Sequence, residues 1–147
     1  MTRRRELITF FEDYEASLNA AILCDEPGAA AAASAFGETF VDGKQAGVEC
    51  RRNDDTFVKA IIATCETYRH NGIRALRLEG IDSTPIDQDH VMTRVHWLAE
   101  YRDADGTDIP VPFDSVYFVR ITGPMKIFGC ITGDEQRALR LHGMAVQ

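Results

Sequence analysis

The chain contains 147 residues, of which 45% are hydrophobic and 27% are charged, and these proportions are typical of an ordinary globular domain. The formal net charge of −7 argues against a nucleic-acid partner and an anionic membrane surface, because both require an excess of Lys and Arg. No apolar run approaches the ~18 residues needed to span a membrane, and acidic residues interrupt the apolar stretch near the N-terminus. We therefore expect one cytoplasmic domain over residues 1–147, with residues 1–4 flexible and residues 134–147 forming a tail.

The cysteines and histidines give no indication of a metal site. Cys24, Cys50, Cys65 and Cys130 are scattered without a CxxC pair, and the four histidines show no HExxH spacing. The sequence also lacks a P-loop, a GxGxxG element and a GxSxG element. We expect neither a metal nor a cofactor.

Helices are predicted in the first half of the chain. Residues 5–23 place their apolar side chains on one stripe at helical spacing, and the Ala-rich run 29–36 favours a short second helix. Residues 37–52 predict an extended piece with a turn at Asp42-Gly43. A third helix should begin after Asn53-Asp54-Asp55, which can cap it, and should end at Asn71-Gly72.

From residue 73 the hydrophobic period changes from the helical value to two, which is typical of strands. Strands are predicted over residues 73–81, 89–102, 109–121 and 125–132, joined by connections short enough for hairpins. Residues 134–143 are compatible with a final helical turn or with a continued strand. Helices followed by an antiparallel meander indicate an α+β fold, in which helices laid across a strongly twisted sheet enclose a cavity.

This order of elements resembles the NTF2-like superfamily, a cone-shaped α+β group with a cystatin-like fold that includes ketosteroid isomerases and SnoaL-type cyclases. DYEASLNA (13–20) is similar to the ketosteroid isomerase segment that carries the catalytic tyrosine, and TFVDG (39–43) is similar to the segment with the general base. The resemblance implies that Tyr14 is a hydrogen-bond donor and that Asp42 is the base. FDSVYF (113–118) lies where that family keeps a second acid, which would be Asp114.

The same resemblance implies an apolar pocket, for which the expected lining residues are Phe36, Phe40, Val95, Trp97, Tyr101, Tyr117 and Phe128. Pairing the strands around Gly123-Pro124 without a bulge places Phe128 on the inner face and Asp114 on the outer face, with Ser115 pointing inward. A β-bulge would reverse this register.

Each candidate residue also has an ordinary structural interpretation. Asp42 precedes a glycine, and Asp-Gly forms turns on its own account. Tyr14 lies on the apolar stripe of its helix, as a core residue would. Arg3, Arg4 and Arg5 are expected to be solvated.

His96 alternates with Trp97, so the two side chains point to opposite faces of their strand. We expect His96 to face solvent or a second subunit, together with Arg94 and Glu100. Apolar residues are interspersed on that face, which favours a homodimer that packs sheet against sheet, and they are Met92, Leu98, Val116 and Phe118.

Two functions remain open. In the first, the pocket binds a small hydrophobic carbonyl compound and acts as an isomerase, cyclase or dehydratase through Asp42 and Tyr14. In the second, the domain is a non-catalytic ligand-binding or protein-interaction module on the same fold.

Overall fold

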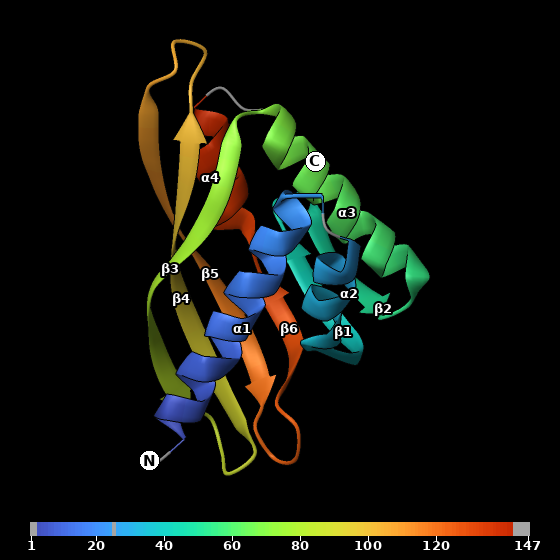
Figure 1. The fold of residues 1–147 in the computed structure, drawn as a ribbon. Helices are drawn as coiled ribbons and strands as arrows, with labels where there is room; N and C mark the ends of the chain where they lie inside the picture. Colours follow the sequence, from blue (N-terminus) through green and yellow to red (C-terminus); the bar gives the residue numbers. More distant parts are fainter. Residues whose placement is uncertain (1–2, 25, 143–147) are drawn as a thin grey trace.

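The computed structural model describes residues 3–24 and 26–142, and these follow the predicted order of two helices, an extended segment, a third helix and a run of strands (Figure 1). The elements are α1 (Arg4–Ile22), α2 (Glu26–Ser34), β1 (Phe36–Lys44), β2 (Gly47–Arg52), α3 (Asp55–His70), β3 (Ile73–Pro85), β4 (His90–Arg102), β5 (Asp108–Arg120), β6 (Lys126–Ile131) and α4 (Gly133–Leu141).

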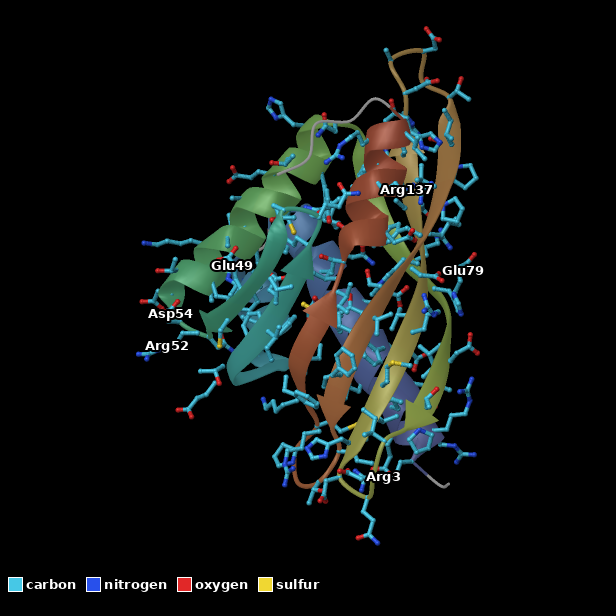
Figure 2. The ribbon with its side chains drawn as sticks, turned by 180° about the vertical axis from the view of Figure 1, so that it is seen from behind. Arg3, Glu49, Arg52, Asp54, Glu79 and Arg137 are labelled. Carbon is cyan, nitrogen blue, oxygen red and sulfur yellow. The ribbon has the colours of Figure 1, made fainter. Side chains whose placement is uncertain are left out.

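The strands form a curled six-stranded sheet in the order β2-β1-β6-β5-β4-β3. The predicted antiparallel meander from β3 to β6 is confirmed, whereas the parallel pairing of β1 with β6 has no counterpart in the sequence pattern. Helix α1 lies across the concave face, and α2 and α3 cover the half of the sheet formed by β1 and β2 (Figure 1). The whole is an α+β cone, and Figure 2 shows from behind that α4 lies beside the upper part of β5; α4 packs against β5 and β1.

Helix α1 is fixed to the sheet by its apolar stripe and by one amide side chain. Leu7, Phe11 and Tyr14 are buried along the stripe. The Asn19 Nδ2 atom donates to the Leu76 carbonyl while Asn19 Oδ1 accepts from the Leu76 amide, each at 2.8 Å. This pair of bonds sets the position of α1 along β3, and therefore the position of Tyr14.

Both predicted ends of α3 are confirmed. The Asp54 side chain accepts a hydrogen bond of 3.2 Å from the Phe57 amide and so caps the helix. Beyond the helix, Gly72 has a φ of 96°, and a Cβ atom there would lie 2.3 Å from the Arg102 carbonyl oxygen. Only glycine meets both conditions without strain.

The predicted turn at Asp42-Gly43 is wrong. Both residues lie inside β1, where Asp42 pairs with Glu49 of β2 and with Cys130 of β6, and the turn comes later, between Lys44 and Gly47. Strands on both sides of β1 outweigh the local turn preference of the dipeptide. Asp42 is thereby carried into the sheet with only 7% of its surface exposed.

Two terminal segments can now be compared with their predictions, namely the arginines predicted to be solvated and the segment left open between helix and strand. Arg4 and Arg5 are exposed, as expected for solvated side chains, whereas Arg3 is partly buried. Arg3 and Arg4 also donate hydrogen bonds to the carbonyls of Ile121 and Ile81, respectively. Residues 133–141 form helix α4, and residue 143, which ends the predicted segment, lies outside the described residues. Residues 1–2 of the segment expected to be flexible and residues 143–147 of the expected tail also lie outside them.

Candidate functional site

The described residues line a cavity of about 320 Å³, partly open to solvent, at the wider end of the cone between α1, α3, α4 and the β1–β2 hairpin. Its volume falls within the range of small-molecule sites. Most of the wall is apolar, and the lining residues include Tyr14, Leu18, Phe36, Phe57, Ile61, Cys65, Tyr68, Ile73, Leu76 and Leu139. The charged groups in the wall are Asp42, Lys44, Arg51 and Glu135.

Asp42 reaches the cavity from the middle of β1 and is held by two cations. Lys44 Nζ and Arg51 Nη1 lie 3.6 and 3.5 Å from its Oδ2 atom, and the Cys130 thiol is 3.6 Å from Oδ1. The Arg51 guanidinium also lies over the Phe57 ring, 5.4 Å from the centroid. A carboxylate with two cationic partners therefore stands at the edge of an apolar cavity.

Tyr14 enters the cavity from α1, and its ring is packed among other aromatic rings. Its centroid lies 5.9 Å from those of Phe36 and Tyr117 and 6.4 Å from that of Trp97. Burial raises the pKa of Tyr14 well above its ordinary value of 10.0, and the nearby Tyr117 hydroxyl acts in the same direction. Tyr14 therefore keeps its proton and can act as a hydrogen-bond donor.

Tyr117 lies behind Tyr14 in the core, on β5. Burial raises its pKa, while hydrogen bonding with the side chains of Trp97 and Tyr14 opposes the increase in part. The buried Ser115 hydroxyl has no hydrogen-bond partner among the described residues. Tyr117 thus packs against the ring of Tyr14, with 5.9 Å between the ring centroids.

Glu135 also lines the cavity, although it was not among the predicted site residues. It lies in the first turn of α4 and is partly buried. Burial raises its pKa from 4.5 to about 7, and Lys44 opposes the increase. A carboxyl group in the first turn of a helix ordinarily favours its charged form, so the burial effect is the larger one here. The only sequence signal was its place three residues after Thr132, within the first turn expected of a helix.

The cavity lies closer to α3 and α4 than the sequence analysis predicted. Of the seven expected lining residues, Phe36 lines it. Phe40, Val95, Trp97 and Tyr117 are buried in the core instead, and Tyr101 is partly buried beside His142, with 6.4 Å between ring centroids. The physical reason is the size of the aromatic rings, which fill the centre of the concave face, so that this cavity lies on the side of α3.

Phe128 was predicted to line the pocket, and this prediction is wrong. Phe118 pairs with Gly129 and Val119 with Ile127, so Phe128 is an extra residue in a β-bulge. The bulge turns the Phe128 ring to the outer face, where it packs 6.0 Å from the Phe118 ring.

Asp114, the third catalytic candidate, lies on the outer face of the sheet and not in the cavity. Its Oδ1 atom accepts a hydrogen bond of 2.8 Å from His96 Nδ1, and His96 Nε2 donates to Asp82 at 2.7 Å. Ser115 takes the buried inner position, as the simplest register predicted. Asp114 and the cavity are thus separated by the thickness of the sheet, and His96 lies on the outer face, as expected.

The two buried thiols are poorly suited to nucleophilic chemistry. Burial raises the pKa of Cys65 to about 11, and burial together with the neighbouring Asp42 raises the pKa of Cys130 to about 12. Across residues 3–24 and 26–142, the His, Cys, Asp and Glu side chains form no group suited to hold a metal ion. No helix in the described part of the chain is long and apolar enough to cross a membrane.

The arrangement of helices and sheet matches known structures of low sequence identity. An NTF2-like protein with a cystatin-like fold from Novosphingobium aromaticivorans has a TM-score of 0.67 and 15% identity, over 87% of this chain and 79% of that one. The protein Aln2 from a Streptomyces species has a TM-score of 0.63 and 13% identity, over 92% and 93% of the two chains. A ketosteroid isomerase-like protein from Erwinia carotovora atroseptica has a TM-score of 0.59 and 13% identity, over 88% and 94%.

These similarities define the fold of the chain. It is the NTF2-like, cystatin-like α+β cone that the sequence resemblance predicted. No protein-family model matches the sequence, and no curated protein is significantly similar to it. Because the matching structures are only 12–16% identical in sequence to this chain, they establish its fold and not its function.

Proposed function

We propose that the cavity binds a small hydrophobic carbonyl compound and catalyses removal of the proton next to the carbonyl group. Asp42 is the base that takes the proton, and Tyr14 donates a hydrogen bond to the oxygen on which negative charge develops. The observation that carries this proposal is that Tyr14 and Asp42, which come from α1 and β1, line one apolar cavity. Few polar groups converging in an apolar wall are the usual form of a ligand site.

The experiment uses allyl phenyl ketone, whose isomerisation to crotonophenone needs one base and is followed by ultraviolet absorbance. We expect the wild type to accelerate this reaction. D42N should lose about 100-fold or more of the rate, the usual scale of a general base, and Y14F should also be slowed. D105N is the matched control, because Asp105 is exposed in the β4–β5 turn. Wild-type turnover by D42N would refute the assignment of the base.

The alternative is a non-catalytic ligand-binding module, and one observation favours it. Asp42 Oδ2 is already engaged by Lys44 and Arg51, so the residue can serve as an ion pair that joins β1 to β2. In that case D42N lowers the free energy of unfolding, and no ketone is turned over by the wild type.

We also propose that the outer face of the sheet packs against a second copy of the chain. Val41, Phe128 and Ile131 are exposed there, close to the half-buried ring of Phe118. Apolar side chains grouped on one face are typical of an interface.

A further inference from the structure

Glu135 combines burial with a position in the wall of the cavity. It is placed over the cavity by α4, which is anchored by buried Leu139 and by two contacts to Gln45. These contacts are a 3.1 Å hydrogen bond from the Gln45 amide to Gln136 Oε1 and a 2.8 Å bond from Arg140 to Gln45 Oε1. The helix is therefore tied to the β1–β2 turn, and Glu135 is held across the cavity from α3.

The charged and titratable groups around this cavity come from four other elements. They are Asp42 and Lys44 from β1, Arg51 from β2, Tyr14 from α1, and Cys65 and Tyr68 from α3. The residues contributed by β3 are apolar. Both cations lie at Asp42, and Glu135 has no ion pair among the described residues.

The two carboxyl groups of the cavity thus face opposite environments. Asp42 is a carboxylate flanked by two cations, whereas desolvation favours the neutral form of Glu135 up to a pH of about 7. A carboxylate held by cations can act as a base, while a desolvated, neutral carboxyl group can act as an acid. Isomerisation needs only one carboxylate, which takes the proton and returns it. A separate acid is useful when a group must leave as its protonated form.

We propose that Glu135 is the general acid of this site and that the reaction is the loss of water from a β-hydroxy carbonyl compound. This inference rests on the proposed function, with Asp42 as base and Tyr14 as donor. It assigns the substrate a carbonyl group, a hydroxyl on the β-carbon and an apolar body that matches the wall.

The atoms balance without a cofactor. The Asp42 carboxylate takes the proton from the α-carbon, and the electrons of that C–H bond form an enolate whose oxygen is held by Tyr14. When the carbonyl re-forms, the enolate electrons make the α,β double bond and the bond from the β-carbon to its oxygen breaks. That oxygen takes the proton of Glu135 and leaves as water. Asp42 is then protonated and Glu135 is ionised, and exchange with solvent restores both.

The test compares two ketones that give the same product. β-Hydroxybutyrophenone loses water to form crotonophenone, and allyl phenyl ketone isomerises to the same compound, so one absorbance assay follows both. In E135Q we expect dehydration to fall by about 100-fold or more while isomerisation stays within a few-fold of wild type. E135D should recover part of the dehydration rate. E66Q is the matched control, because Glu66 is exposed on α3 and lies outside the cavity wall.

The retained isomerisation shows that E135Q has a folded site. Should that variant fail to fold, the wild-type pH profile decides, since dehydration alone must decline as the pH rises through about 7. The inference is overturned if E135Q dehydrates at the wild-type rate, or if the wild type isomerises one ketone without dehydrating the other. In both cases the proposed function stands. If the wild type converts neither ketone, the proposed function is overturned as well.

Discussion

Asp42 and Glu135 line the same cavity from β1 and α4, and the cations of the site are placed at Asp42. Lys44 and Arg51 lie within 3.6 Å of one Asp42 oxygen, whereas burial dominates at Glu135. Because proton affinity follows from such surroundings, one site can hold a charged and a neutral carboxyl group together. The chemistry proposed for this chain depends on that difference.

The burial of Glu135 predicts how stability changes with pH. Its pKa is raised from 4.5 to about 7 in the folded chain, so between these values the folded state binds more protons than the unfolded state. The free energy of unfolding should therefore fall as pH rises across this interval, by up to about 3 kcal/mol, since each pKa unit corresponds to about 1.4 kcal/mol. E135Q should remove this component and be more stable than wild type at pH 8. Urea unfolding from pH 5 to pH 8 measures both, and parallel curves for the two proteins would refute the prediction.

Two substitutions at Tyr14 should distinguish a role of its hydroxyl group in ligand binding from a role of its ring in core packing. Its ring contacts Phe11, Phe36, Trp97 and Tyr117. Y14F keeps these contacts and should change the free energy of unfolding by about 1 kcal/mol or less, while Y14A should cost about 3–5 kcal/mol. Chemical denaturation of both variants, beside the isomerisation assay, provides the measurement. A Y14F protein as unstable as Y14A would mean that the hydroxyl serves the core and not the ligand.

We expect exposed apolar residues on the outer face of the sheet to hold two copies of the chain together as a dimer. Ile131 is 52% exposed on that face, so I131E should leave the fold intact and convert a dimer into a monomer in light scattering coupled to gel filtration. Ile86 is equally exposed but lies in the β3–β4 connection, and I86E should remain dimeric. The sheet-to-sheet dimer is excluded if the wild type is already a monomer at the concentrations where it is active.

His96 gives a second, weaker dependence on pH. Hydrogen bonds to Asp82 and then to Asp114 raise the pKa of His96, while the bond from His96 lowers the pKa of Asp82. The stabilisation from His96 is complete below its ordinary pKa of 6.5 and is lost as the pH rises through its raised pKa. The stabilisation from Asp82 is present above its ordinary pKa of 3.8 and is lost as the pH falls through its lowered pKa.

Because the His96 side chain is 38% exposed, solvent screening limits the effect to about 1 kcal/mol or less. Thermal unfolding of H96Q should show a smaller decline than wild type between pH 6 and pH 8. An identical decline in the two proteins would show that the His96 contacts do not contribute.

Much of the fold follows from local patterns in the sequence. The period-two segments become β3 to β6 within a few residues, because alternation along a strand is fixed by the pleat. Asp54 and Gly72 bound α3 through capping and a positive φ, which are also local effects. The long-range pairing of β1 with β6 could not be predicted in this way, and the turn assigned to Asp42-Gly43 failed for that reason.

The site was predicted only in part. Tyr14 and Asp42 were found through a family resemblance, and both line the cavity. Phe128 was misplaced because a bulge of one residue reverses the face of a side chain. Glu135 was missed because its surroundings are made by α1, α3 and β1, and nothing in the segment that carries it shows that those elements will bury it.

A pH titration of the glutamate side-chain carboxyl signals by ¹³C NMR, in the wild type and in E135Q, tests the role of Glu135 directly. We expect one glutamate signal that titrates near pH 7 and is absent from the spectrum of E135Q. If every glutamate in the wild type titrates near its ordinary value of 4.5, the cavity holds no neutral carboxylic acid and the proposed division between Asp42 and Glu135 is contradicted.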